Sequence, residues 1–117
     1  MEKNTKVVII GGGVVGCSIL YHLSKFGLKD CILLERNELT SGSSWHAAGN
    51  VHVISNDPNI SRMMAYTIGL YKEIEKESGH SVGFKPSGGF YLASNETWAD
   101  YLKRERSKAR YMGLDQE

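Results

Sequence analysis

The chain has 117 residues, a formal net charge of +1, 41% hydrophobic residues and 23% charged residues. These values are ordinary for a soluble globular protein, and so small a net charge excludes a global field that would attract nucleic acid or an anionic membrane surface. No apolar stretch is long enough to span a bilayer. Cys17 and Cys31 fit neither a metal site nor a redox motif. We therefore expect two small buried thiols, no metal, and a cytoplasmic location.

The N-terminal residues predict one βαβ unit. The apolar run Val7–Ile10 is short and stops at a glycine, as a strand of a parallel sheet covered on both faces would. From Gly13 onward, apolar residues recur every three to four positions, which indicates a helix, and Gly27 is placed to end it. A second apolar run, Cys31–Leu34, ends at Glu35. We expect two parallel strands joined by a right-handed helical crossover.

The middle of the chain predicts a loop and then a long helix. Residues 37–55 are rich in Ser, Gly, Ala and His and show no clear period, so we expect a loop with one short helix at most. Asp57 followed by Pro58 is typical of a helix start. A stripe of apolar residues continues this helix until Gly79, and the stripe is typical of a core face.

The last third of the chain predicts a β-hairpin and a final helix. Two short apolar runs at residues 82–85 and 90–93 are joined by Pro-Ser-Gly-Gly, which is typical of a hairpin. A helix follows over residues 96–112, capped by Ser94 or Asn95. A doubly wound fold needs more parallel strands than the two expected here, so we interpret the chain as the front of a longer protein.

The turn after the first strand carries the first functional signal. Gly11, Gly13 and Gly16 fit the pattern G-x-G-x-x-G between a strand and a helix. In such a turn the first glycine permits the sharp bend, the second lets a pyrophosphate approach the backbone, and the third lets the helix lie close to the sheet. The amides of Val14 and Val15 then face the phosphates at the helix N-terminus. This setting predicts a dinucleotide site.

Glu35 is the expected ribose ligand of that site. It lies at the end of the second strand, nineteen residues after Gly16, where a carboxylate can accept hydrogen bonds from the ribose hydroxyls. The alternative is a surface acid paired with Arg36 or Lys29. Arg36 at the same site would suit the 2′-phosphate of NADP, but the neighbouring acid would repel that phosphate, which makes NADP the weaker candidate. The turn and the acid do not by themselves separate FAD from NAD.

A second loop follows the acid and favours FAD. Small residues and hydroxyls in a row leave backbone amides available and let a flat ligand approach, and an NAD enzyme has no general need for such a loop. The cofactor-binding residues expected here are Gly42, Ser43, Ser44, Trp45, His46, Ala47, Ala48, Gly49 and Asn50.

This segment, together with the Glu-Arg pair before it, resembles the dimethylglycine dehydrogenase and sarcosine dehydrogenase family of D-amino-acid-oxidase-like FAD oxidoreductases. The similarity runs from Val7 to about Leu114, and the string Trp-His-Ala-Ala-Gly at residues 45–49 is its specific part. The resemblance implies that FAD is bound through a covalent bond between His46 and the 8α-methyl carbon of the flavin. The alternative is a histidine that only hydrogen-bonds the cofactor.

The resemblance also implies an activity. Members of the family oxidise small N-methylated amino acids such as sarcosine or dimethylglycine, and their tetrahydrofolate-binding C-terminal part lies outside these 117 residues. No catalytic residue and no electron acceptor can be named from this chain. The alternatives are a non-catalytic regulatory relative with the same fold and an NAD-binding oxidoreductase. We expect an α/β fold in which residues 1–80 are the N-terminal part of a Rossmann-like FAD-binding domain and residues 81–117 begin the substrate domain.

Overall fold

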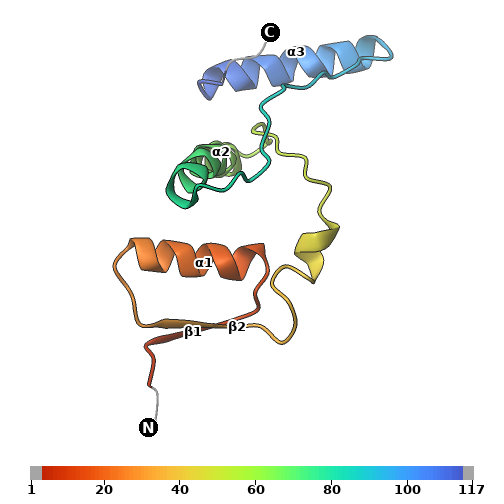
Figure 1. Ribbon diagram of the computed structural model, residues 1–117. Coiled ribbons are helices and arrows are strands. Elements are labelled where there is room, and N and C mark those ends of the chain that lie inside the picture. The colour runs from red at the N-terminus through yellow and green to blue at the C-terminus, as the bar shows by residue number, and fades with distance from the viewer. Residues whose placement is uncertain (1–3, 115–117) are drawn as a thin grey trace. The chain divides into compact units, whose positions relative to one another are not determined.

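The structure is a computed structural model that describes residues 4–114. These residues form two strands, three α-helices and one 3-10 helix. Figure 1 shows them along the chain. In chain order they are β1 (Val7–Ile10), α1 (Val14–Lys25), β2 (Cys31–Leu34), η1 (Ser43–His46), α2 (Pro58–Ser78) and α3 (Glu96–Tyr111).

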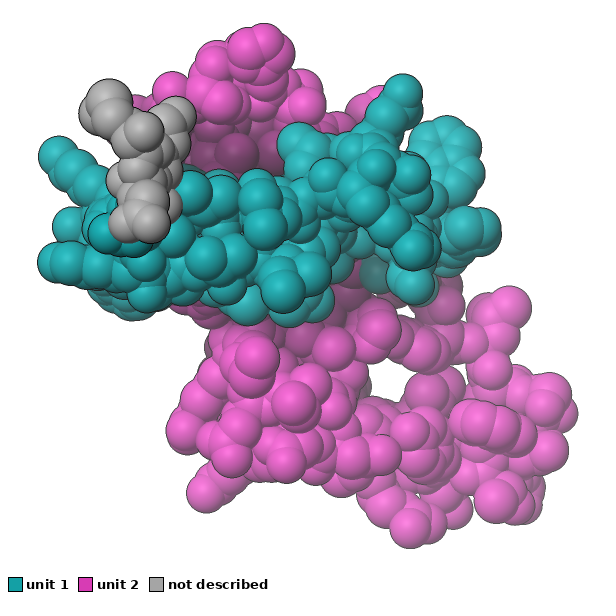
Figure 2. Space-filling model, turned by 90° about the horizontal axis from the view of Figure 1, so that it is seen from below, with its two compact units in different colours: residues 1–50 teal, residues 51–117 magenta. Residues whose placement is uncertain are grey.

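The chain divides into two units, residues 1–50 and residues 51–117, which Figure 2 colours separately. The domain boundary that we predict after residue 80 concerns a longer protein and stays a prediction. The mixed α/β composition and the parallel strand pair agree with the expected fold class.

The first unit is the predicted βαβ unit. Strands β1 and β2 pair in parallel, with Val7 opposite Cys31 and Ile10 opposite Leu34. Helix α1 lies along one face of the pair (Figure 1), and Ile9 on that face is only 7% exposed. The sequence is right about both strands and the helix between them, because the apolar periods of strand and helix differ clearly here.

The opposite face of this sheet differs from the expectation. The run Val7–Ile10 predicts a strand covered on both faces, but within residues 4–50 only α1 packs on the strand pair. The outward side chains stay largely exposed, and Ile10 reaches 87%. The apolar side chains on this uncovered face are Val8, Ile10, Ile32 and Leu34.

The ends of α1 and α2 are set by capping residues that can be recognised in the sequence. Helix α1 is capped at its C-terminal end by Phe26, and Gly27 follows in the left-handed conformation with φ 87°. Helix α2 starts behind Asp57, whose carboxylate accepts hydrogen bonds from the amides of Asn59 at 2.7 Å and Ile60 at 3.3 Å. Its C-terminal cap is Gly79, with φ 70°. These predicted helix boundaries are confirmed.

The predicted hairpin is not formed. Residues 80–93 contain no strand, and Phe90 and Leu92 are 99% and 90% exposed. A two-stranded hairpin without a further strand or helix to pack on is marginal in water. In this segment Phe84 contacts the Tyr71 ring of α2, whereas the second apolar run at residues 90–93 is exposed. The beginning of the segment is instead held to α2, where the Glu75 carboxylate accepts the amide N–H of Val82 at 2.8 Å.

The final helix forms as predicted. Helix α3 begins behind Asn95, whose side-chain oxygen accepts the amide N–H of Trp98 at 2.9 Å, so Asn95 and not Ser94 is the cap. Of the helices in residues 4–114, none combines the length and the apolar character that a membrane crossing requires.

Candidate dinucleotide site

The glycine turn is built by close backbone contacts. Gly11 has a φ of 104°, and its N–H donates to the carbonyl oxygen of Leu34 at 2.8 Å, which ties the turn to the end of β2. A β carbon added to Gly16 would fall on the carbonyl oxygen of Gly11 and lie 3.5 Å from the Ile9 side chain. Gly11 therefore supplies the bend, and Gly16 supplies the space that lets α1 approach β1.

The start of α1 is open to an anion. Its first intrahelical hydrogen bond runs from the Cys17 N–H to the Gly13 oxygen at 3.0 Å, so the amides of Val15 and Gly16 lie outside the helical ladder. Gly13 has no side chain to cap them, and the first turn contains no acidic residue. The positive end of the helix dipole is thus not neutralised by the helix itself.

One amide of this helix start is bound from the second loop. The N–H of Val14 donates to the Ser44 hydroxyl oxygen at 2.8 Å, although thirty residues separate the two in sequence. The sequence places both residues at the cofactor, and the structure brings them into contact. Ser44 can also donate its own hydroxyl proton, so this contact leaves a donor for a ligand.

Glu35 lies directly at the glycine turn. Its carboxylate accepts the Gly12 N–H at 2.7 Å and the Asn37 N–H at 2.9 Å. The Asn37 hydrogen bond, then the Gly12 hydrogen bond, hold the pKa of the Glu35 carboxyl below its usual range, and the charge of Arg36 adds the smallest effect. In the described part of the chain, neither Lys29 nor Arg36 forms an ion pair with it. Each carboxylate oxygen keeps a further lone pair for a ribose hydroxyl.

Gly12 is a part of the site that the sequence reasoning missed. The G-x-G-x-x-G pattern leaves this position open, yet a β carbon here would meet the Leu39 side chain at 2.5 Å and the Glu35 β carbon at 3.0 Å. The Gly12 carbonyl oxygen accepts the N–H of Thr40 at 2.9 Å. The only sequence signals were a third glycine between the two of the pattern, at position 12, and one leucine in an otherwise polar loop.

The second loop presents His46 with a defined tautomer. Residues Ser43–His46 form η1, and the His46 Nδ1 atom lies 3.1 Å from the carbonyl oxygen of Gly42. A carbonyl oxygen can only accept, so in the neutral imidazole this contact puts the proton on Nδ1 and leaves the Nε2 lone pair free. The His46 imidazole is exposed, and this arrangement makes Nε2 an available nucleophile.

The remaining predicted residues are placed less tightly. Trp45 is 78% exposed, and Arg36 lies on the surface beside Glu35. Residues 47–50 continue beyond η1 without regular structure, and in the described chain they form no hydrogen bond with the glycine turn. The structure thus joins the glycine turn, Glu35 and Ser44 into one site and leaves the end of the loop open.

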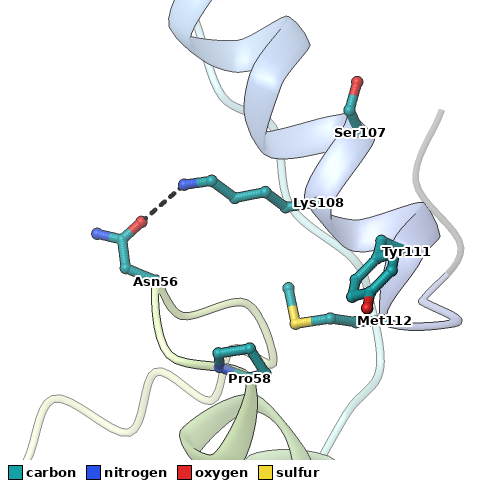
Figure 3. A pocket seen from close by; sticks show the side chains of 6 residues that line it. All are labelled: Asn56, Pro58, Ser107, Lys108, Tyr111 and Met112. Atoms are coloured by element: carbon teal, nitrogen blue, oxygen red, sulfur yellow. Dashed lines mark hydrogen bonds between the residues drawn. The ribbon is translucent and has the colours of Figure 1, made fainter.

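A separate hollow lies in the second unit. It has a volume of about 430 Å³, and Figure 3 shows six side chains that line it, from the end of α3 and the residue after it and from the start of α2 and the turn before it. Lys108 in its wall is already bonded, to the side-chain oxygen of Asn56 at 3.0 Å and to Glu105 at 2.7 Å. None of the lining residues belongs to the predicted dinucleotide site.

Comparison with known proteins identifies the family. The model of the family described as FAD dependent oxidoreductase (DAO) matches residues 6–117. The chain belongs to this family. The match decides for FAD over the NAD that the glycine turn and Glu35 left open.

Individual members of the DAO family are similar over nearly the whole chain. Human mitochondrial dimethylglycine dehydrogenase is 40% identical over 98% of this chain, and human mitochondrial sarcosine dehydrogenase is 37% identical over 98%. The mouse mitochondrial regulatory subunit of pyruvate dehydrogenase phosphatase is 36% identical over 100% of it. In each case the chain spans only 13% of the relative's length.

These relatives correct one expectation. We expected a cytoplasmic protein, and that is wrong, because these dehydrogenases of the DAO family are mitochondrial. Free thiols indicate a reducing compartment, but they do not separate the cytosol from the mitochondrial matrix. Cys17 and Cys31 are both free and half-buried here, which suits either compartment.

Proposed function

We propose that this chain is the N-terminal, cofactor-binding part of an FAD-dependent enzyme that oxidises small N-methylated amino acids. In this enzyme the flavin is linked covalently to His46. The observation that carries the proposal is the placement of His46. A histidine whose Nδ1 proton is engaged by Gly42 offers Nε2 for bond formation, in a chain 40% identical to a dimethylglycine dehydrogenase.

The residues present fit the adenosine and pyrophosphate half of FAD. The uncapped start of α1, without an acid in its first turn, suits a pyrophosphate that would lie on the amides of Val15 and Gly16. Glu35 keeps lone pairs for the ribose hydroxyls, and Ser44 keeps a donor. Gly13 completes the cradle, because a β carbon there would lie 3.1 Å from the Ser44 hydroxyl.

The role of His46 is to hold the flavin permanently. When bound, FAD would supply a two-electron acceptor and an electrophilic 8α carbon, and His46 would hold it through Nε2. The Gly42 carbonyl oxygen fixes the imidazole by hydrogen bonding to Nδ1. A covalent tether of this kind prevents loss of the cofactor and shifts its reduction potential.

The substrate side of the proposal comes from the relatives. Dimethylglycine dehydrogenase and sarcosine dehydrogenase are named for N-methylated amino acids, and we extend that substrate class to this chain. Tetrahydrofolate as a carbon acceptor belongs to the same proposal. The residues that we assign in this chain bind the cofactor. None of them is assigned the role of taking a proton from the amine substrate or of orienting it.

Acid precipitation of the full-length protein tests the covalent link. Yellow colour that stays with the precipitate supports a bond to His46, and His46→Ala should release the flavin to the supernatant. A wild-type protein that releases its flavin overturns the covalent part of the proposal. A colourless protein without FAD overturns the cofactor itself.

A regulatory function is the second candidate, because the phosphatase regulatory subunit is 36% identical over the whole chain. The two candidates differ in turnover. Anaerobic addition of sarcosine or dimethylglycine to the flavin-loaded full-length protein should bleach the visible flavin absorbance if the protein is a dehydrogenase. A flavin spectrum that neither substrate changes favours the regulatory protein.

A further inference from the structure

Thr40 has the most unusual backbone of the first unit. Its φ is 65°, and among residues 4–114 it is the one residue other than glycine with a positive φ. A β-branched side chain disfavours this left-handed conformation, because its Cβ substituents crowd the neighbouring peptide groups. Such an outlier persists only where surrounding contacts determine it, and outliers of this kind cluster at functional sites.

The backbone hydrogen bond of Thr40 leads to the glycine turn. Its N–H donates to the Gly12 carbonyl oxygen at 2.9 Å. The Leu39 side chain just before it lies against the Gly12 α carbon, on the space that a β carbon would fill. The Gly12 N–H is meanwhile bound by Glu35 at 2.7 Å. The peptide group on each side of Gly12 is thereby fixed from the loop that follows β2.

The left-handed bend also returns the chain to α1. Immediately after Thr40, the Ser41 N–H and hydroxyl both donate to the Glu38 carbonyl oxygen, at 3.3 Å and 2.8 Å. The loop then reaches the helix start, where Ser44 accepts the Val14 N–H at 2.8 Å. One bend therefore separates two contacts, one on the glycine turn and one on the helix.

We propose that Thr40 is a positioning residue of the dinucleotide site: its left-handed backbone lays residues 39–44 over the glycine turn, which holds Gly12 and the first amide of α1 in place before the cofactor binds. The backbone does this work, and the Thr40 hydroxyl is not required. The inference rests on the proposed function, since the site it organises is the one proposed for FAD.

Three substitutions at this position test the proposal in the full-length protein, made in a His46→Ala background so that FAD binding is reversible. Thr40→Pro removes the N–H and forbids a positive φ. Thr40→Asn keeps the N–H and favours the left-handed conformation. Thr40→Val keeps the β-branched shape and the N–H but lacks the hydroxyl. FAD is titrated into the flavin-free protein, and amide hydrogen exchange is followed in residues 11–17 before FAD is added.

We expect Thr40→Pro to weaken FAD binding about tenfold, as the loss of an organising hydrogen bond would. It should also speed exchange in residues 11–17, while the cooperative unfolding transition of the protein is retained. Thr40→Asn and Thr40→Val should stay within about twofold of the parent in affinity and in exchange. A structural role without positioning would lower stability but leave the affinity of the folded fraction unchanged.

Several results would overturn the proposal. Binding by Thr40→Pro within twofold of the parent does so, and so does a loss of binding in Thr40→Val, which would assign the effect to the hydroxyl. If Thr40→Pro fails to fold, amide exchange in residues 11–17 still decides: it should be slower in Thr40→Asn, which favours the left-handed conformation, than in Thr40→Val, which disfavours it, and equal rates would overturn the proposal. A parent protein that binds no FAD at all overturns the proposed function, whereas FAD binding that ignores these substitutions overturns only the role of Thr40.

Discussion

Gly16→Ala tests the close approach of α1 to β1, on which the glycine turn depends. The added β carbon would fall on the carbonyl oxygen of Gly11 and lie 3.1 Å from the carbonyl carbon of the same residue. Both obstructing atoms are backbone, so no side-chain rotation can make room. The start of α1 must then move away from the strand, or the Gly11 turn must open.

The size of the effect follows from two opposing terms. Overpacking of this kind costs about 1–3 kcal/mol, and the backbone obstruction places Gly16 at the upper end. Alanine is favoured over glycine in a helix by about 1 kcal/mol, which offsets part of the loss. We expect the free energy of unfolding to fall by about 2 kcal/mol, a change of more than tenfold in the ratio of folded to unfolded protein.

Denaturant unfolding of the full-length protein, with the flavin content of each purified variant, measures this. Gly69→Ala in α2 is the matched control, because nothing lies within 4 Å of the β carbon it would add. That control should raise the unfolding free energy by about 0.5–1 kcal/mol through helix propensity alone. The reasoning fails if Gly16→Ala unfolds at the same denaturant concentration as the parent and keeps its full flavin content.

Two further predictions concern a cap and a carboxylate. Asp57→Ala should lower the unfolding free energy by about 1 kcal/mol, because the amides of Asn59 and Ile60 lose their acceptor. Asp57→Asn should keep most of the capping contribution. Urea midpoints of the two variants measure this, and equal midpoints would contradict the role of Asp57 as the cap. Glu35 has a lowered pKa in the fold, so its stabilising contribution is complete above its unfolded pKa and disappears as the pH falls through the folded value. Unfolding between pH 7 and pH 3 should therefore show an acid-side loss that Glu35→Gln reduces, and superimposable profiles would refute this.

Much of the first unit is predictable because its signals are local. The run Val7–Ile10 has the length and the apolar character of a buried strand, and the residues after Gly13 change to a helical period. Helix ends are equally local, because Asp57 and Gly79 act through hydrogen bonds and dihedral angles within a few residues. The glycine turn adds a fixed spacing to the acid at the end of the second strand, and the structure adds a contact between Glu35 and the turn that the spacing alone did not predict.

The parts that could not be predicted depend on partners distant in sequence. Residues 82–85 and 90–93 have the composition of strands, but a strand needs a neighbouring layer, and here the segment packs no further than Glu75 and the Tyr71 ring. Thr40 was missed for the opposite reason. Residue preferences argue against a β-branched residue at φ 65°, and the conformation is held by the hydrogen bond to Gly12 together with the bonds from Ser41 to the Glu38 carbonyl oxygen.

The two signals that the sequence offered separately, a glycine turn and a ribose acid, are one unit in the structure. The Glu35 carboxylate holds the Gly12 N–H, so the group expected to bind ribose also fixes the turn expected to bind pyrophosphate. The same turn carries a contact from Thr40, and Ser44 binds the helix that follows it. A substitution that breaks any of these contacts would disturb the others through Gly12 or α1. The dinucleotide site is therefore organised by contacts within residues 11–46, whereas His46 presents its free Nε2 where that organised segment ends.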